Sequence, residues 1–562
     1  MSINDRFYMD IHCHSTQKPF AQSIKMVPAF KNSTDPIHPH SIWHHDPPSD
    51  FDKFSNTLWG LTRFRQGDFT SLAKGNVRVV CVPLGPLEQG FVTIRENASW
   101  KNLEIFKQDW LVLGPLARFV AKKLRLLSIL FDFITGLGRA KLREMKNRSD
   151  HRSYFKELDK ENSYLAGLNR QSTLTPGIDG QNWSYFLARD YEIMMETLEN
   201  NPKSIAVIPT IEGVYALGSD LDPKCRKNDR DLDIDYILDN VKNVKGWDFP
   251  PFFITFACHF NNRLCHHSMS CPRLLHYFLG FRYRMRSVFT RNGEKIIDRL
   301  LDTVPSEHNI GKRILIDIKH MSRRSRAAYI GWLDKYNKRP LTENSNEGYV
   351  PFEERVPIMV SHAGVFGSRR WKRISFRKRE PFVKKDINIY DDEIEEIFRT
   401  GGLIGIQLDE RIIGHKGYFK RVKKRIEKID KEIKSLTDNL TEDPDKEKNL
   451  NNEKRKKWIE PVWNQIWHIA NVLDRLDESH YSNGQTCWDI ACLGTDFDGH
   501  IDPINEYWTA KELPRMEADL LLVAKDSLSN WSPHHSGNAL NAEEIIDKFM
   551  SKNMGEFLRR HL

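Results

Sequence analysis

The sequence predicts an α/β fold, a (β/α)8 barrel of the TIM type that carries long insertions. Eight short runs rich in Val, Ile, Leu and Phe recur along the 562 residues, and segments long enough for helices separate them. Apolar runs without polar alternation are typical of strands buried on both faces, and strands that alternate with helices form parallel sheets. Ionisable side chains directly follow six of the eight runs. Polar residues gathered at one end of the strands are typical of barrel enzymes.

The expected strands are spread over nearly the whole chain. They occupy residues 7–11, 77–84, 204–211, 252–257, 313–318, 356–360, 403–408 and 490–493. A chain of this length allows about three or four domains of roughly 150 residues, but a barrel with insertions can use all of it. We therefore expect one barrel domain over residues 1–562.

Composition narrows the class of protein. There are 85 Lys and Arg against 76 Asp and Glu, a net charge of +9 without the sharp basic cluster expected of a nucleic-acid binder. The eight cysteines form no CxxC pair, which is typical of reduced thiols. Neither a secretory signal nor an apolar run of about 18 residues is evident. These features predict a cytoplasmic protein that does not bind nucleic acid.

Two of three expected insertions lie in the first third of the chain. Residues 17–74 are rich in Pro, His and Trp and are predicted to form an irregular loop over the barrel mouth; the histidines there are expected on the surface rather than in a second metal site. Residues 110–148 are apolar with interleaved basic residues. That pattern fits a peripheral helix on an anionic membrane, or a segment buried against the barrel or a second subunit, which we favour.

The third insertion, residues 413–458, is charged and predicted to form a helical hairpin. Its apolar residues step by four and three in alternation, which is a heptad seam: Val422, Ile426, Ile429, Ile433, Leu436 and Leu440. The seam could form a homodimer contact, serve as a partner handle or a spacer, or pack on its own returning helix. The sequence leaves these alternatives open.

Candidate metal ligands follow the expected strands. They are His12, His14, Glu212, His259, His320, His362 and Asp496. The pair His12 and His14 points to one side of the chain, because strand side chains repeat every second residue. Nitrogen and oxygen ligands of this kind bind zinc, and one glutamate can share its two oxygens between two ions about 3.5–4 Å apart. The set therefore predicts one or two zinc ions that activate water.

An ordered set of motifs resembles the membrane dipeptidase (renal dipeptidase) family of the metal-dependent amidohydrolase superfamily. The motifs are Ile211-Glu212-Gly213, Ile316-Asp317-Ile318-Lys319-His320-Met321-Ser322, Val360-Ser361-His362, Gly401-Gly402-Leu403-Ile404 and Gly494-Thr495-Asp496-Phe497-Asp498-Gly499. The resemblance implies a zinc barrel in which His12 binds the first ion, Glu212 bridges, and His320 and His362 bind the second. It also implies that Asp496 is the acid/base and that His259 contacts the substrate carbonyl.

The chain departs from the family pattern at two positions. His14 stands where the family has Asp, and Ile387 stands where the family has an Arg that holds the substrate carboxylate. Asn388 beside it, and Arg369 and Arg370 from a nearby basic cluster, are the residues expected to bind substrate in its place. A bidentate partner for a carboxylate is hard to replace, which weakens the case for a free carboxylate in the substrate.

These observations predict a zinc-dependent, dipeptidase-like hydrolase that cleaves an amide bond in a dipeptide or a similar small substrate, with two zinc ions per chain. Hydrolysis of a cyclic amide, lactone or ester on the same metals is the alternative, and the absent arginine favours it. A non-catalytic scaffold built around the hairpin is a third interpretation. The full ligand set argues against the scaffold.

Overall fold

The computed structural model describes most of the chain. The described residues are 6–24, 35–91, 132, 135–148, 152–167, 169–171, 182–219, 232–270, 288–304, 311–338, 355–369, 381–438, 443–482 and 484–562.

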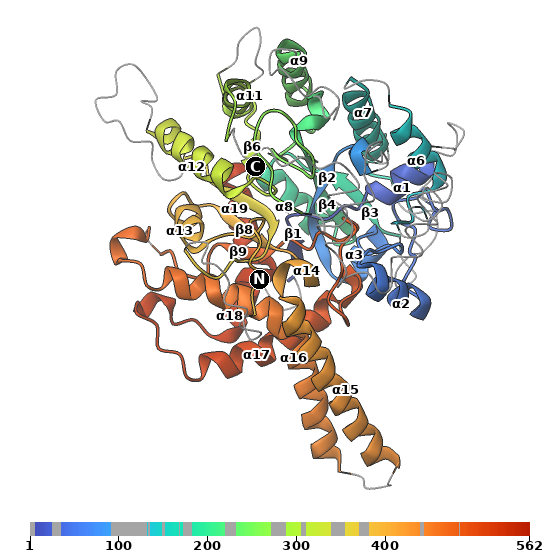
Figure 1. Ribbon diagram of the computed structural model, residues 1–562, viewed down its shortest axis with the longest axis vertical. Coiled ribbons are helices and arrows are strands. Elements are labelled where there is room, and N and C mark those ends of the chain that lie inside the picture. Colours follow the sequence, from blue (N-terminus) through green and yellow to red (C-terminus); the bar gives the residue numbers. More distant parts are fainter. Residues whose placement is uncertain are drawn as a thin grey trace, which may run out of the picture.

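Parallel strands form a barrel at the centre of the molecule (Figure 1). Eight of them pair in the order β1 (Tyr8–Asp10), β2 (Val77–Leu84), β4 (Ser204–Glu212), β5 (Phe253–Thr255), β6 (Leu315–Asp317), β7 (Met359–Ala363), β8 (Leu403–Ile406) and β9 (Ala491–Leu493). Each lies in or overlaps one predicted run. The predicted (β/α)8 barrel is therefore confirmed.

The last strand meets the first and nearly closes the barrel. The Ile11 N–H donates to the Leu493 carbonyl at 3.0 Å. Just beyond the strands, the Thr495 hydroxyl donates to the Asp10 carboxylate at 2.6 Å. These contacts bring the segments that carry His12 and Asp496 together, although the two residues are 484 positions apart in sequence.

A ninth strand lies off the barrel path, and the sequence did not reveal it. β3 (Ser184–Leu187) pairs in parallel with β4 alone, from Ser184 with Ser204 to Leu187 with Val207. It lies beside residues 204–207, the N-terminal half of β4. Its identity as a strand depends on pairing with β4, which no local pattern encodes, so the sequence does not predict it.

Helices separate the strands and form the insertions. In chain order they are α1 (Gln17–Ser23), α2 (Asp50–Trp59), α3 (Phe69–Lys74), α6 (Arg139–Lys146), α7 (Arg152–Gly167), α8 (Tyr191–Asn200), α9 (Ile234–Lys245), α11 (Arg291–Leu301), α12 (Arg323–Asn337), α13 (Asp391–Arg399), α14 (Glu410–Ile413), α15 (Lys416–Asp438), α16 (Pro444–Leu473), α17 (Leu513–Leu528), α18 (Ala542–Asp547) and α19 (Asn553–His561). Side-chain caps begin several of them; Asp190 accepts the Ile193 N–H at 2.9 Å at the start of α8.

The segment 17–74 is more regular than predicted. It contains α1, α2 and α3 where an irregular loop was expected, since Ser49 and Asp68 cap the second and third of these helices. It lies against the loop after β9, because Lys18 Nζ and the Gly67 N–H both donate to the Asp498 carboxylate, at 2.8 and 2.9 Å. Of the segment 110–148, only 132 and 135–148 are described, with α6 in that part. The rest of the segment, for which a peripheral membrane helix and a buried segment were the alternatives, lies outside the described residues.

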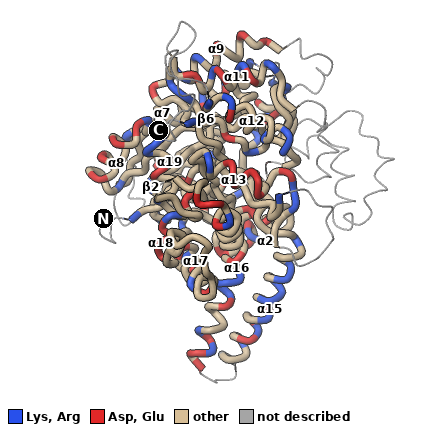
Figure 2. The backbone as a smooth tube through the Cα atoms, turned by 90° about the vertical axis from the view of Figure 1, so that its left-hand side faces the viewer, with Lys and Arg blue, Asp and Glu red and all other residues tan. Residues whose placement is uncertain are grey.

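The third insertion is a helical hairpin that projects from the barrel (Figures 1 and 2). It consists of α15 and α16, and α16 continues past the expected end to Leu473. Ile429 in the seam is fully buried, and Arg425 on α15 forms an ion pair with Glu453 on α16 at 2.7 Å. The seam residues nearest the barrel therefore pack on the returning helix, which was one of the open alternatives.

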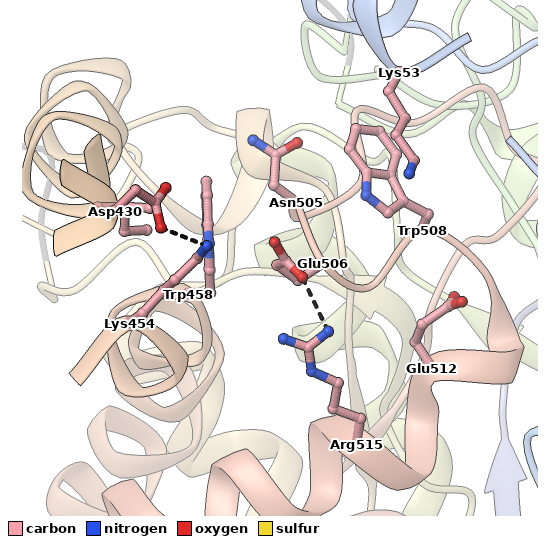
Figure 3. Close-up of a pocket in the computed structure, with 10 residues that line it drawn as sticks. Lys53, Asp430, Lys454, Trp458, Asn505, Glu506, Trp508, Glu512 and Arg515 are labelled. Carbon is pink, nitrogen blue, oxygen red and sulfur yellow. Dashed lines mark hydrogen bonds and ion pairs between the residues drawn. The ribbon is translucent and has the colours of Figure 1, made fainter. Parts of the chain in front are cut away.

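A cavity of about 480 Å³ lies at the base of the hairpin, between α2, α15, α16 and the segment before α17 (Figure 3). Trp458 and Trp508 line it together with two ion pairs, Lys454–Asp430 and Arg515–Glu506. None of the predicted site residues lines this cavity. Among the described helices, none combines the length and apolar character needed to cross a bilayer.

Candidate metal centre

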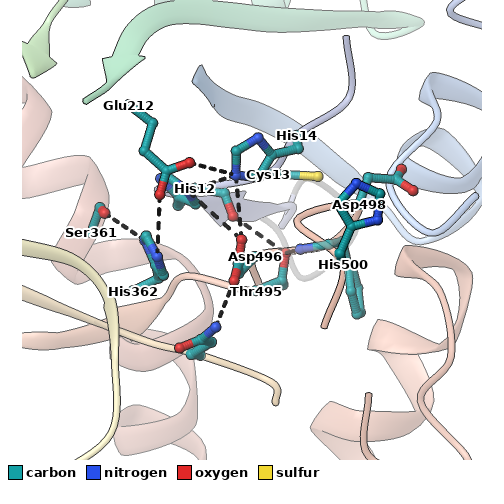
Figure 4. A network of polar contacts seen from close by, with 12 residues as sticks. His12, Cys13, His14, Glu212, Ser361, His362, Thr495, Asp496, Asp498 and His500 are labelled. Carbon is teal, nitrogen blue, oxygen red and sulfur yellow. Dashed lines mark hydrogen bonds and ion pairs between the residues drawn. The ribbon is translucent and has the colours of Figure 1, made fainter. Parts of the chain in front are cut away.

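Six of the predicted ligands converge at the carboxyl ends of the barrel strands. Figure 4 labels all of them except His320. The six come from five strands or the residues just after them: His12, His14, Glu212, His320, His362 and Asp496. All are buried or nearly so, with side chains no more than 14% exposed. The six side chains converge because the parallel strands of a barrel all end at one rim.

The spacing of the ligand atoms fits shared metal ions. Atoms about 2.0–2.1 Å from one tetrahedral ion lie roughly 3.3–3.4 Å apart. His12 Nε2 and His14 Nε2 are 3.2 Å apart, and His14 Nε2 is 3.2 Å from Glu212 Oε2. Glu212 Oε1 lies 3.2 Å from His320 Nε2 and 3.7 Å from His362 Nε2. Glu212 thus belongs to two ligand groups, one through each oxygen.

The charges of the side chains at this centre also favour a bound cation. Burial raises the pKa of Glu212, but hydrogen bonds from His14 and His320 outweigh it and hold that pKa well below its usual range. Burial lowers the pKa of His14, yet its contacts with Asp496 and Glu212 raise it to about 10. In the metal-free centre this imidazolium therefore offsets part of the negative charge of the two buried carboxylates, and a metal ion would take over that role.

The tautomer of His362 is fixed by its neighbours. The Ser361 hydroxyl has one hydrogen, which goes to Asp317 Oδ2 at 2.6 Å, so it accepts from His362 Nδ1 at 2.8 Å. Nε2 of His362 is then unprotonated and faces Glu212. A metal-ligating histidine is usually held in this way.

Asp496 is oriented by Gln407, which the sequence reasoning missed. Gln407 Nε2 donates to Asp496 Oδ2 at 2.5 Å, and Gln407 Oε1 accepts from Lys319 Nζ at 3.2 Å. Asp496 Oδ1 then faces His14 Nε2 at 3.4 Å. Gln407 directly follows β8, so the same rim argument that found the histidines could have identified it. Its uncharged side chain was not considered.

The loop that carries Asp496 has an unusual backbone. Asp496 and Asp498 have φ values of 58° and 66°, which non-glycine residues seldom adopt. A Cβ on Gly499 would lie 2.0 Å from Asp496 Oδ1, so only glycine leaves room for the carboxylate. The contacts of Lys18 and Gly67 with Asp498 hold this conformation.

His259 lies beside the centre, as predicted. Its ring centroid is 4.9 Å from that of His320, and its Nδ1 is 2.6 Å from the Ser270 hydroxyl. The Glu88 carboxylate accepts the backbone N–H groups of His259 and Phe260 at 3.2 and 3.0 Å. Burial, together with nearby His320, lowers the pKa of His259 to about 3, so the ring is neutral and can donate one hydrogen bond.

The predicted substrate-binding residues near β7 do not join the centre. Asn388 is fully buried and its Nδ2 donates to the carbonyls of Val383 and Ile412 at 3.1 and 2.8 Å, so it stabilises the loop instead. The Arg369 side chain is 62% exposed and forms an ion pair with Glu395 on α13. Arg370 lies outside the described residues. Ile387, at the position of the expected arginine, is buried.

Comparisons with known proteins give only remote similarities. No family model and no curated protein sequence matches the chain. Similar solved structures include the probable dipeptidase PvdM from Pseudomonas aeruginosa, with a TM-score of 0.45 and 12% identity over 88% of each chain. Another is a metallo peptidase from Rhodobacter sphaeroides liganded with a phosphinate mimic of the dipeptide L-Ala-D-Ala, with a TM-score of 0.44 and 11% identity over 99% of each chain. A third, the dipeptidase AC, has a TM-score of 0.43 and 11% identity over 99% of each chain.

Proposed function

We propose that this protein is a metal-dependent hydrolase, dipeptidase-like, that cleaves an amide bond in a dipeptide or a similar small substrate. The observation that carries the proposal is the position of Glu212, whose two oxygens face His14 on one side and His320 with His362 on the other. A carboxylate shared by two groups of nitrogen ligands is typical of two-metal hydrolytic sites.

The donor set suits zinc. His12, His14 and Glu212 would hold one ion, and Glu212, His320 and His362 the second. Imidazole and carboxylate ligands match zinc preferences. When bound, such ions lower the pKa of water and polarise a carbonyl oxygen.

The protein's own groups handle the proton and orient the substrate. Asp496 Oδ1 faces the ligand cluster while Gln407 holds Oδ2, so one oxygen is positioned to take a proton from the attacking water. Burial raises the pKa of Asp496, which favours its passing that proton to the departing nitrogen. The neutral ring of His259, fixed by Ser270, is positioned to donate a hydrogen bond to the carbonyl oxygen as charge develops there.

A second candidate is hydrolysis of a cyclic amide, lactone or ester on the same metals. Two observations favour it. Ile387, at the position of the expected arginine, is apolar and buried, and Arg369 forms an ion pair with Glu395. Neither can pair with a free substrate carboxylate. A substrate without that carboxylate would need no such partner.

The test uses the full chain, stripped of metal and reloaded with zinc. Hydrolysis is measured on dipeptides, the same dipeptides as C-terminal amides, and a lactone and cyclic amide series. We expect zinc to restore activity, and Asp496→Asn to lower kcat about 10²–10⁴-fold. Asp502→Asn, the same change at a partly buried carboxylate outside the cluster, should leave kcat unchanged. Activity on amidated and free dipeptides alike would favour the second candidate, and no hydrolysis of any substrate would contradict both.

A further inference from the structure

Cys258 lies beside two histidines of the proposed centre. Its Sγ, one ring nitrogen of His259 and one of His320 all lie within 4.8 Å of one another. The cysteine follows β5, is 4% exposed and has no disulfide partner. The proposed hydrolytic reaction gives it no role. Sulfur beside two imidazoles is a softer donor set than the rest of the centre offers.

In each of the two histidines, one ring nitrogen is left to bind a metal ion beside the sulfur. His259 Nδ1 is engaged by Ser270, which leaves Nε2. His320 Nε2 faces Glu212, whereas its Nδ1 is buried and has no hydrogen-bond partner. A metal-ligating histidine usually gives its second nitrogen to a carboxylate, carbonyl or water. The bare Nδ1 of His320 is therefore an unexplained donor atom on a ring that lies beside a thiol.

We propose that Cys258, His259 and His320 form a separate binding site for a thiophilic metal ion, such as Cd²⁺ or excess Zn²⁺. As the sulfur–metal bond forms, the S–H bond breaks and its proton leaves. Glu88 is hydrogen-bonded to the Cys258 thiol, and the thiol proton is released to the buffer as the metal binds. The site uses Sγ, His259 Nε2 and His320 Nδ1, so it can fill while His320 Nε2 serves the hydrolytic centre.

Occupation of this site has a consequence that rests on the proposed function. An ion bound to Nε2 of His259 removes the group that meets the substrate carbonyl. Once both ions of the hydrolytic centre are bound, excess thiophilic metal should then inhibit hydrolysis. Inhibition of this kind would make the enzyme sensitive to the free concentration of soft metals.

The test is a cobalt titration of the metal-depleted full chain, followed by absorbance. Cobalt bound by nitrogen and oxygen alone gives only weak visible bands, whereas a cysteine ligand adds an intense thiolate-to-cobalt band in the near ultraviolet. We expect the visible bands first and the thiolate band with further cobalt. Cys258→Ser should lose the thiolate band and keep the visible bands, which also shows that this variant is folded. Cys265→Ser, a buried cysteine in the same segment, should keep both.

Two results would overturn the site: visible bands without any thiolate band in the unmodified protein, or a thiolate band that survives in Cys258→Ser. Absence of every cobalt band would contradict the proposed function as well, so the two failures are distinguishable. As a second readout, Cd²⁺ in excess over the hydrolytic ions should inhibit the unmodified enzyme and not Cys258→Ser. Equal inhibition of both would contradict the assignment.

Discussion

Ser361 Oγ lies 2.8 Å from Nδ1 of His362 and must accept that hydrogen, because its own hydrogen goes to Asp317 at 2.6 Å. Asp317 also accepts the Thr255 hydroxyl at 2.6 Å. A buried carboxylate beneath the rim therefore determines which nitrogen of His362 is available to a metal. The ligand set depends on residues that touch no metal themselves.

The first prediction concerns the hydrogen bonds that link His362 through Ser361 to Asp317. Ser361→Ala removes the acceptor for His362 Nδ1, so His362 is free to adopt the wrong tautomer and orientation. We expect metal affinity to fall about 10–100-fold, as measured by competition with a chromogenic chelator. Ser527→Ala, on α17 and far from the rim, serves as the control and should bind metal normally. Equal affinity in the two variants would show that Ser361 does not orient the ligand.

The second prediction concerns Gln407. Gln407→Met keeps the side-chain volume and removes the hydrogen bond to Asp496 Oδ2. We expect kcat to fall about tenfold, equivalent to about 1.4 kcal/mol, because the carboxylate loses its fixed orientation. Metal content, measured by mass spectrometry of the loaded protein, should not change. Loss of metal together with kcat would instead mean that Gln407 supports the ligands.

The third prediction concerns pH. The contacts of His14 with Asp496 and Glu212 raise its pKa to about 10, so in the metal-free protein it is protonated at neutral pH. A metal ion must displace that proton. Apparent affinity should therefore rise with pH, about tenfold per unit below pH 10, and binding should release a proton. Calorimetry in buffers of different ionisation enthalpy measures the release.

A control separates His14 from the other ligands. In His14→Ala the proton held between the two carboxylates is absent, so the number of protons released on metal binding should be lower than in the unmodified protein. Equal release in both proteins would contradict the assignment of the raised pKa to His14.

The fourth prediction concerns the hairpin. Ile429 is fully buried in the seam, and Ile429→Ala should lower the stability of the hairpin by about 2–5 kcal/mol. Hydrogen exchange of the α15 amides would report the change. The exposed neighbour Lys428→Ala should change it by less than about 0.5 kcal/mol. If the two variants exchange alike, the seam does not pack on α16.

The fold and the convergence of the candidate ligands were predictable from sequence for one reason: both follow from where parallel strands end. Apolar runs mark the strands, and the polar residue after each run falls on the common rim, as His12, His320 and His362 do. Gln407 and Cys258 also follow strands, but the sequence does not show what their side chains contact, which is Asp496 for Gln407 and Glu88 for Cys258.

The incorrect expectations had a different cause. Asn388 was assigned from its place in a motif, but its amide satisfies two buried carbonyls. The segment 17–74 was predicted to be irregular because it is rich in Pro, His and Trp, whereas its helices depend on local caps such as Ser49. The short strand β3 is defined by pairing with β4, which no local pattern encodes.

The most direct test of the central claim is anomalous diffraction from crystals of the zinc-loaded full chain, recorded on either side of the zinc absorption edge. We expect two anomalous peaks flanking Glu212, one near His12 and His14 and the other near His320 and His362. A map without a peak at Glu212, or with a single ion that leaves one group of histidines empty at saturating zinc, would contradict a two-metal centre.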